Sequence, residues 1–301
     1  MTGPLLKISV YTLLEAEEAV SALVERVFGQ TPVLYTDDET LITQISVYCA
    51  KPSAWTPARR QKIVAGLAGL RAHGLAVGRT RISTQKLKEQ DWAESWKRHF
   101  KPLEIGDALL VKPSWSRRQP RAGQALIVLD PGLSFGTGQH PTTRFCLEQV
   151  VACRSLEEPK SMLDAGTGSG ILAIAAAKLG YGRIHAFDFD PVAIRVAREN
   201  AVRNGVEKQI RFSQKDLTRM AVQAPERFDL VCANLLDDLL VREVVRLSNR
   251  VKRGGRLVVA GILTRQFAKV RKAFEKEGLK LLMEKTDNIW QSGVFAWLDN
   301  A

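Results

Sequence analysis

A glycine-rich turn between an apolar strand and an apolar helix constrains the fold of this chain more than any other stretch. Residues 161–163 have the composition of the end of a buried strand, and Ile171 begins an alanine- and leucine-rich run with no helix breaker until Gly180. The turn between them is Asp164-Ala165-Gly166-Thr167-Gly168-Ser169-Gly170. Glycines allow a ligand to touch the backbone, and the start of a helix offers unpaired N–H donors. The sequence therefore predicts a ligand site at this strand-to-helix turn.

An acidic residue further along the chain indicates the kind of ligand. Asp188 follows Gly170 by 18 residues and ends a second short strand at 184–187. An acidic side chain near this distance can hydrogen-bond the hydroxyls of a ribose. The glycine spacing is G-x-G-x-G, whereas turns that cradle the pyrophosphate of a dinucleotide read G-x-G-x-x-G. The spacing resembles the first motif of the S-adenosylmethionine methyltransferases with a Rossmann-like fold, in which this loop runs along the methionine part of the cofactor.

Strands and helices alternate beyond the turn. Predicted helices span 191–203, 238–250 and 265–277, and predicted strands lie at 184–187, 210–213, 228–233, 256–260, 279–284 and 293–298. This pattern predicts an α/β domain with a doubly wound, mostly parallel sheet, in which ligands bind at the carboxyl ends of the strands. Polar residues stand at four predicted strand ends: Asp164, Asp188, Asp216 and Asn234. A lone aspartate there usually caps a turn or helix, but four on one edge predict a common site.

A second glycine-rich stretch precedes the first. Residues 130–143 read DPGLSFGTGQHPTT and hold too many glycines and prolines for a regular element. Pro141 then begins a helix to about Ala152, with Thr142 and Thr143 in its first turn. A loop of this kind, leading into a helix N-terminus, can enclose an anionic group such as the carboxylate of the cofactor. The alternative is an elaborate helix cap that binds no ligand.

The N-terminal third predicts a separate small domain. Strands at 5–12, 31–35, 41–48 and 79–85 and helices at 13–28 and 57–72 give the order β-α-β-β-α-β, which predicts an α+β ferredoxin-like domain over residues 1–88. It contains no catalytic constellation, so docking is its expected role. Trp92, Trp96 and Phe100 share one face of a predicted linker helix at 89–103. The doubly wound domain would then occupy residues 104–301, starting with short strands at 108–111 and 125–129.

Composition limits the compartment and the partners that we expect for the protein. The chain has 301 residues, no apolar run long enough to span a bilayer and no signal-peptide pattern, so we expect a cytoplasmic protein without a membrane partner. Its four cysteines lack metal-ligand spacing, which predicts reduced, buried thiols and no metal site. The formal net charge of +12 is spread over the sequence. It favours acidic partners such as RNA or the ribosome surface as much as it indicates a solvated surface.

Several motifs together resemble one family, the ribosomal protein L11 methyltransferases (PrmA type). They are Trp92-x-x-x-Trp96-Lys97-x-x-Phe100, Leu129-Asp130-Pro131-Gly132, Phe135-Gly136-Thr137-Gly138-x-His140-Pro141-Thr142-Thr143, Gly168-Ser169-Gly170-Ile171-Leu172-Ala173-Ile174-Ala175 and Ala260-Gly261-Ile262-Leu263. The resemblance covers roughly residues 90–298; over the N-terminal domain it rests on predicted topology. It implies a monomer whose N-terminal domain recognises the ribosomal protein, and whose catalytic domain uses S-adenosylmethionine to methylate lysine side chains and the N-terminal amine. It also implies cofactor contacts at Thr143, Gly166, Asp188 and Asn234.

One segment departs from the family pattern. The family reads Asn-Ile-Leu-Ala-x-Pro-Leu where this chain reads Asn234-Leu235-Leu236-Asp237-Asp238-Leu239-Leu240. The acidic pair suits a helix N-terminus, which favours negative charge. The sharper hypothesis is that the pair attracts an incoming lysine.

The chemistry of methyl transfer to an amine assigns expected roles to these residues. The sulfonium already activates the methyl group, so positioning and loss of the amine proton dominate, without a metal. We expect Asn234 to orient the amine, Asp188 to bind the ribose, and Gly166, Gly168 and Gly170 to line the methionine part of the cofactor. Asp216 either binds the adenine amino group or caps a helix. His140 either accepts a proton or has a structural role.

Two other functions remain open from the sequence, besides a different protein lysine as acceptor. An RNA methyltransferase would suit the charge, but enzymes that methylate base amino groups typically carry an aromatic after Asn-Pro-Pro to stack the base, and Leu235 and Leu236 follow Asn234 here. The other alternative is an inactive binding or assembly factor. The intact glycines, Asp188 and Thr143 argue against it.

Overall fold

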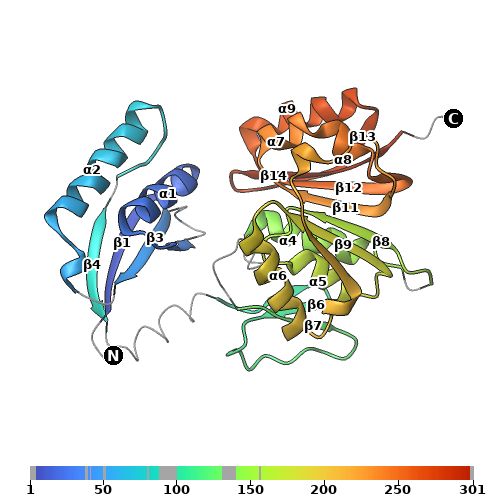
Figure 1. The fold of residues 1–301 in the computed structure, drawn as a ribbon, viewed down its shortest axis with the longest axis horizontal. Coiled ribbons are helices and arrows are strands. Elements are labelled where there is room, and N and C mark those ends of the chain that lie inside the picture. Colours follow the sequence, from blue (N-terminus) through green and yellow to red (C-terminus); the bar gives the residue numbers. More distant parts are fainter. Residues whose placement is uncertain are drawn as a thin grey trace. The chain divides into compact units, whose positions relative to one another are not determined.

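The computed structural model describes residues 5–37, 40, 42–49, 52–79, 81–87, 100–130, 140–155 and 157–298. The chain divides into two compact units, Met1–His99 and Phe100–Ala301, which we name the N-terminal and C-terminal units (Figure 1). The linker helix is predicted to reach residue 103, but its end is wrong: residues 100–102 are irregular, and Leu103 begins a strand. The rest of that predicted helix lies at 89–99, and most of the second glycine-rich stretch lies at 131–139. Both segments lie outside the described residues.

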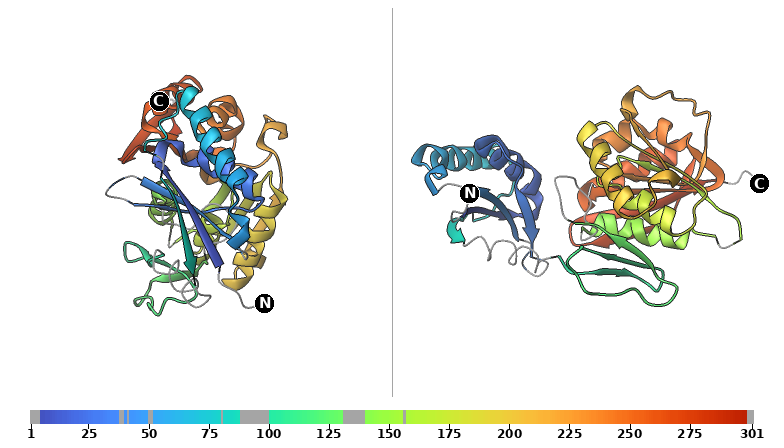
Figure 2. Two further views of the ribbon diagram at one scale, coloured as in Figure 1. Left: turned by 90° about the vertical axis from the view of Figure 1, so that its left-hand side faces the viewer. Right: turned by 60° about the horizontal axis from the view of Figure 1, so that its bottom comes forward.

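A four-stranded antiparallel sheet forms the N-terminal unit. Its elements are, in chain order, β1 (Leu5–Leu13), α1 (Glu17–Phe28), β2 (Val33–Thr36), β3 (Ile42–Cys49), α2 (Pro57–Ala72) and β4 (Ile82–Leu87). The strand order β2-β3-β1-β4 agrees with the predicted ferredoxin-like topology. Helices α1 and α2 lie side by side on one face of the sheet in both views of Figure 2.

The alternation of side chains along β1 explains why the helices cover that face. Leu6, Ile8 and Val10 are buried in one cluster with Val20 of α1 and Ile63 of α2. Successive side chains of a strand point to opposite faces, so Lys7, Ser9 and Tyr11 belong to the other side of the sheet. Each face of this sheet therefore has its own chemistry.

The sequence predicts the start of one N-terminal helix correctly and the start of the other too early. Helix α2 starts at Pro57 as predicted, because the N-cap Thr56 hydroxyl accepts a hydrogen bond from the Arg59 N–H at 3.2 Å. The helix predicted to begin at Leu13 begins later. Leu13 stays in β1 because it pairs with Ile42 of β3, and a 3₁₀ turn at Leu14–Ala16 precedes α1.

A seven-stranded, doubly wound sheet forms most of the C-terminal unit and confirms the predicted fold class. Its strands are β8 (Ser161–Ala165), β9 (Arg183–Asp188), β10 (Ile210–Gln214), β11 (Phe228–Asn234), β12 (Val251–Leu263), β13 (Leu279–Asp287) and β14 (Trp290–Trp297). Their order is β10-β9-β8-β11-β12-β14-β13. Of these seven strands, β14 alone runs opposite to the other six. The order reverses between β8 and β11, where such sheets bind ligands.

Helices cover both faces of this sheet. One face packs against α4 (Pro141–Ala152), α5 (Ile171–Lys178) and α6 (Pro191–Arg203), and the other against α7 (Asp237–Arg242), α8 (Val244–Ser248) and α9 (Thr264–Lys276) (Figure 1). Alternate residues of the buried strands supply the two cores: Met162 and Cys232 face the first group of helices, Leu163 and Val231 the second. Strands buried on both faces explain their near-continuous apolar sequences.

The helix predicted at 238–250 is two short helices, α7 and α8. Glu243 separates them with φ −104° and ψ 19°. Its carboxylate is buried and binds the guanidinium groups of Arg242 and Arg246 at 3.2 and 2.7 Å. A buried, doubly paired carboxylate at this point favours the break, which the periodicity of the sequence does not reveal.

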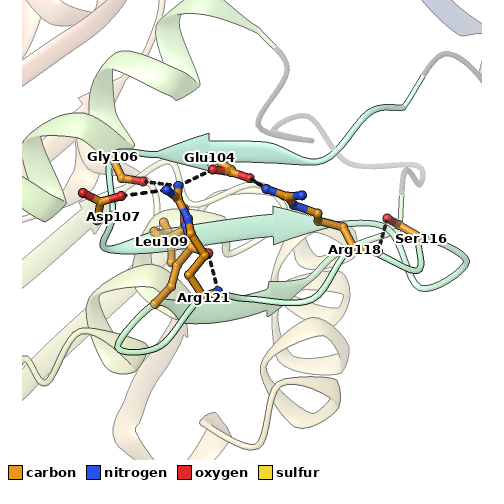
Figure 3. Close-up of polar contacts among 8 residues, drawn as sticks. Glu104, Gly106, Asp107, Leu109, Ser116, Arg118 and Arg121 are labelled. Atoms are coloured by element: carbon orange, nitrogen blue, oxygen red, sulfur yellow. Dashed lines mark hydrogen bonds and ion pairs between the residues drawn. The ribbon is translucent and has the colours of Figure 1, made fainter.

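A small three-stranded sheet precedes the large one. It contains β5 (Leu103–Ile105), which the sequence analysis did not predict, β6 (Leu109–Lys112) and β7 (Ala125–Val128). Figure 3 shows Glu104 of β5 held by Arg118 and Arg121 from the basic loop between β6 and β7; Arg121 also pairs with Asp107 at 3.0 Å. These arginines are about half exposed, so solvent strongly screens each ion pair.

All four cysteines are free thiols, as predicted. Cys49, Cys146 and Cys232 are buried and Cys153 is partly buried; burial raises the pKa of the Cys146 thiol. Across the described ranges, no helix is long and apolar enough to cross a membrane. The same residues include no group of His, Cys, Asp and Glu side chains arranged to hold a metal ion.

Candidate active site

The glycine-rich turn after β8 adopts a conformation that requires glycine. Gly166, Gly168 and Gly170 have φ values of 76°, 52° and 82°, in the left-handed region that side chains rarely adopt. Space is limiting as well. A Cβ on Gly166 would lie 2.5 Å from Leu235 Cδ2, and one on Gly170 would lie 3.0 Å from the Cβ of Ala197 in α6. The turn is therefore closely surrounded by the segment after β11 and by α6.

Asp188, at the end of β9, is bonded directly to this turn. Its Oδ2 accepts a hydrogen bond from the Gly168 N–H at 2.9 Å, and its Oδ1 accepts one from the Asp190 N–H at 3.1 Å. The N–H groups of Gly166 and Thr167 donate to the Phe187 carbonyl at 2.9 and 3.0 Å. A carboxylate has about four lone-pair sites, so Asp188 retains capacity for hydroxyl donors. Hydrogen bonds thus hold the glycine-rich turn and Asp188 together as one unit. A site for ribose needs its acceptor held in this way.

Asp164 supports the turn from beneath. It is 1% exposed, and its Oδ2 accepts a hydrogen bond from the Thr167 hydroxyl at 2.6 Å. Burial raises the pKa of Asp164 to about 7, although hydrogen bonds from Thr167 and from the Ala173 backbone act in the opposite direction. Part of this group is therefore protonated at neutral pH.

Asn234 ends β11, which lies beside β8 in the sheet. Ala233 pairs with Ala165, so Asn234 stands level with Gly166 at the same edge. Its Oδ1 is buried, and no residue in the described ranges forms a hydrogen bond with it. Gly261 of β12 packs against it: with φ 83°, a Cβ there would lie 2.9 Å from Asn234 Oδ1 and 2.8 Å from the Leu235 carbonyl oxygen. An unpaired buried acceptor costs about 1–3 kcal/mol, which a donor on a ligand would recover.

The start of α4 brings a second unpaired group. Pro141 occupies the first turn as predicted, and the His140 side chain caps the helix. Its Nδ1 accepts from the Thr142 N–H at 3.4 Å and lies 2.7 Å from the Thr142 hydroxyl. Burial lowers the pKa of His140 to about 4, so the ring is neutral near pH 7. Thr143, which follows Thr142, is 1% exposed, and its Oγ1 has no partner within the part of the chain that the structure describes.

Trp290 completes this side of the site, and the sequence analysis missed it. Its ring packs edge-on against His140 with 4.8 Å between centroids, and its buried Nε1 forms no hydrogen bond with any described residue. Because β14 runs antiparallel, its first residue lies at the edge where the parallel strands end. Trp290 pairs there with Leu263, two residues beyond Gly261. No local pattern marks this tryptophan, since its role depends on the direction of β14.

Three of the buried polar atoms without partners therefore gather at one place. Among the described residues, Thr143 Oγ1, Asn234 Oδ1 and Trp290 Nε1 are in this condition together with Ser248 Oγ of α8. The first three stand on elements that touch one another, since α4, which carries Thr143, packs against both β11 and β14. We name the edge that carries them, the glycine-rich turn and Asp188 the carboxyl edge. Its unpaired atoms fit a ligand with both donors and acceptors.

Asp216 lies at the same edge, but its carboxylate already accepts hydrogen bonds from a neighbouring residue. The preceding residue, Lys215, donates its N–H to the Asp188 carbonyl at 2.8 Å. Asp216 Oδ1 accepts from the N–H and hydroxyl of Thr218 at 2.9 and 2.8 Å and so caps a 3₁₀ turn; these bonds lower its pKa. The cap that the sequence offered as an alternative is present. Contact with adenine stays a prediction.

Two further features flank the site. Phe189, directly after Asp188, is 74% exposed, an unusual state for a large apolar side chain, and the sequence analysis did not select it. Asp237 and Asp238, the departure from the family pattern, begin α7 and lie 3.8 and 2.6 Å from Lys269 Nζ of α9. A pair already neutralised by a lysine of this chain has less charge left to attract another.

Comparisons with known proteins agree with this geometry. Residues 5–296 match the family model described as ribosomal protein L11 methyltransferase (PrmA). A relative of that name from Geobacter sulfurreducens is 44% identical over 209 residues, which cover 69% of this chain and 67% of that protein. One from Streptococcus agalactiae is 38% identical over 237 residues, covering 78% and 72%.

A solved structure gives the same answer for the fold. The ribosomal protein L11 methylase from Lactobacillus delbrueckii subsp. bulgaricus superposes with a TM-score of 0.59 and 29% identity, covering 66% of this chain and 99% of that one. Because the family model spans nearly the whole chain and these relatives are 38–44% identical over at least two thirds of it, this chain belongs to the ribosomal protein L11 methyltransferase family.

Proposed function

We propose that this chain transfers methyl groups from S-adenosylmethionine to lysine side chains and the N-terminal amine of ribosomal protein L11. The observation that carries the proposal is the carboxyl edge: a glycine-rich turn bonded to Asp188, beside unpaired buried atoms of Thr143 and Asn234. The acceptor follows from the relatives, which are named for L11.

The residues present fit the cofactor. Gly166, Gly168 and Gly170 leave the backbone of the turn open to its methionine part, and Asp188 accepts hydrogen bonds from the ribose hydroxyls. Thr143 donates its hydroxyl to the carboxylate at the start of α4. Exposed Phe189 offers a face for adenine, next to the predicted contact of Asp216. When bound, the cofactor supplies a methyl group activated by a sulfonium.

The chain's own residues then position the amine. Asn234 Oδ1 accepts a hydrogen bond from an N–H of the incoming amine and aligns its lone pair with the methyl group. Only a neutral amine has this lone pair, so the proton of the ammonium must leave first. His140 is neutral but uses Nδ1 in the helix cap, which favours its structural role. Orientation and exclusion of water by Leu235 and Trp290 supply most of the rate.

The wider organisation is part of the same proposal. We assign residues 1–88 to recognition of the ribosomal protein, 89–103 to a linker and 104–301 to catalysis. The enzyme would act as a monomer in the cytoplasm, where free ribosomal proteins occur.

The experiment that tests the function is methylation of purified L11. The full chain is incubated with labelled cofactor and, in parallel, with L11, an unrelated lysine-rich protein or ribosomal RNA. We expect label in L11, with mass spectrometry locating it on lysines and the N-terminus. Label confined to RNA or to the unrelated protein would assign a different acceptor. Cofactor binding by calorimetry without any transfer would indicate a binding factor.

A further inference from the structure

The segment that leads from Asn234 into α7 ends in a short helix without a side-chain cap. Helix α7 has six residues and begins at Asp237, three positions after Asn234. Its N-cap is Leu236, which is 58% exposed and whose side chain cannot accept a hydrogen bond. A helix of this length depends on contacts with the rest of the fold. The start of α7 must therefore be held by another element.

A lysine of α9 makes that contact. Helices α7 and α9 pack against each other (Figure 1). Lys269 Nζ lies 2.6 Å from Asp238 Oδ1 and 3.8 Å from Asp237 Oδ2. The Asp237 side chain is only 11% exposed, so solvent screens its charge less than that of a surface group. Because both carboxylates approach one ammonium, loss of Lys269 would leave two like charges side by side at the start of α7.

Helix α9 is a firm support for this lysine. One side of α9 is buried in the same core cluster as Leu240 of α7, through Phe267, Val270 and Phe274. The start of α9 is bonded to the opposite flank of the carboxyl edge, since the N–H and hydroxyl of Thr264 donate to the Ile289 carbonyl at 2.8 and 3.0 Å. Ile289 directly precedes Trp290. Helix α9 thus connects the two flanks of the site.

A shift at the start of α7 would reach Asn234. Only Leu235 and Leu236 separate Asn234 from α7, and the Leu235 N–H donates to the Ala260 carbonyl at 3.1 Å. Gly261 packs so closely that a Cβ there would lie 2.9 Å from Asn234 Oδ1. The orientation of the Asn234 amide therefore depends on where the following residues are held.

We propose that Lys269 is a positioning residue for methyl transfer. Its ion pairs with Asp237 and Asp238 fix the start of α7 and so hold the Asn234 amide in place. The effect on turnover rests on the proposed function, whereas the contact itself does not. The family pattern has proline at the position of Leu239, and proline restricts the backbone. In this chain, ion pairs with α9 restrict it instead.

Hydrogen exchange measured by mass spectrometry tests the contact without any turnover. Lys269→Ala should speed exchange of the α7 amides at 240–243 by at least about fivefold, because the start of the helix then opens more often. Lys269→Arg keeps the charge and should exchange within about twofold of the native chain. Lys272→Ala removes the same charge from an exposed position of α9 and is the matched control, which should exchange as the native chain does.

Steady-state kinetics with L11 distinguish positioning from capture of the acceptor. Lys269→Ala should lower kcat about tenfold and leave KM within about twofold, because misplacing a reacting group by about 1 Å can cost about a hundredfold in rate. Adding Asp238→Ala should lower kcat little further, since both changes remove the same contact. Calorimetric titration with the cofactor checks that each variant is folded, because Asp188 and the glycine-rich turn are held by their own hydrogen bonds.

The proposal is overturned by unchanged exchange in Lys269→Ala, by equal effects of Lys269→Ala and Lys272→Ala, or by unchanged kcat in Lys269→Ala. A lower KM in that variant with unchanged kcat would show that the freed acidic pair captures the ammonium of the acceptor, which also overturns it. A native chain that transfers no methyl group to L11 would contradict the proposed function. Exchange would still decide whether Lys269 holds α7.

Discussion

The carboxyl edge and the N-terminal sheet both place polar groups on strands, but in opposite ways. At the carboxyl edge, parallel strands end together, and among the described residues the buried Thr143 Oγ1 and Asn234 Oδ1 have no hydrogen-bond partner. On the face of the N-terminal sheet turned away from α1 and α2, the side chains of Ser9, Ser46 and Gln44 hydrogen-bond one another across antiparallel strands. Unpaired buried groups at strand ends suit a small ligand held for chemistry, whereas polar groups that pair with one another stabilise the sheet itself.

The largest effect is expected at the carboxyl edge, the catalytic side of this comparison. Asn234→Ala removes the acceptor that orients the amine, so kcat for L11 should fall by about 100-fold or more, as for other lost hydrogen bonds to a reacting group. The Kd of the cofactor should change only a few-fold. Steady-state kinetics and calorimetry measure the two quantities. Normal turnover in this variant would remove Asn234 from the mechanism.

The next effect is a pH dependence of the stability of the fold, which arises from the buried carboxyl group of Asp164. The pKa of Asp164 is about 7 in the folded chain and lower when unfolded, so the folded state binds the proton more tightly. Its contribution to stability is complete at low pH and is lost as pH rises to and through about 7. Asp164→Asn should abolish this loss, which we expect on the order of 2–4 kcal/mol between pH 4 and pH 8.

Denaturant unfolding at several pH values measures this difference. Only the difference in unfolding free energy between the native chain and the variant is diagnostic, because His140 acts with the opposite sign. Burial lowers the pKa of His140 to about 4, so its contribution to the stability of the fold is lost as pH falls through 6 to 4. A difference that is constant with pH would show that Asp164 does not titrate.

A glycine pair tests whether space at the turn matters for the cofactor. Gly166→Ala and Gly180→Ala both force alanine to adopt left-handed φ, at 76° and 85°, so each should lower the free energy of unfolding by about 1–2 kcal/mol. Only the first brings a Cβ against Leu235; Gly180 has nothing within 4 Å. We expect cofactor Kd to rise about tenfold in the first variant alone. Equal affinities would mean that the turn does not contact the cofactor.

The smallest expected effect concerns Asp216. Because its carboxylate caps a 3₁₀ turn, Asp216→Ala should lower the melting temperature slightly and raise cofactor Kd by less than about threefold. Thermal unfolding and calorimetry give both values. A tenfold loss of affinity would instead establish the predicted contact with adenine.

Local signals explain what the sequence predicts well. The turn at 164–170, Asp188 and Asn234 lie in or beside their own strands, so strand ends and glycine spacing locate them without tertiary information. The starts of α2 at Pro57 and α4 at Pro141 follow equally from the proline at the first helical position, whereas the cap by His140 emerges only from the structure.

What escapes prediction depends on contacts between distant segments. Trp290 reaches the site because β14 inserts antiparallel between β12 and β13, and Leu235 fills the space above Gly166 because β11 lies beside β8. Strand β5 is too short to show a pattern and exists through its pairing with β6. Glu243 divides a predicted helix through buried ion pairs that periodicity does not reveal. Topology, more than residue type, determines these features.

The most direct test of the carboxyl edge is a crystal structure of the full chain with S-adenosylhomocysteine. We predict ribose hydroxyls within about 3.2 Å of the Asp188 carboxylate, a typical hydrogen-bond distance, with the methionine part along residues 166–170 and Thr143 Oγ1 paired. A nucleotide bound elsewhere, or Asp188 and Thr143 left without contact to it, would contradict the account.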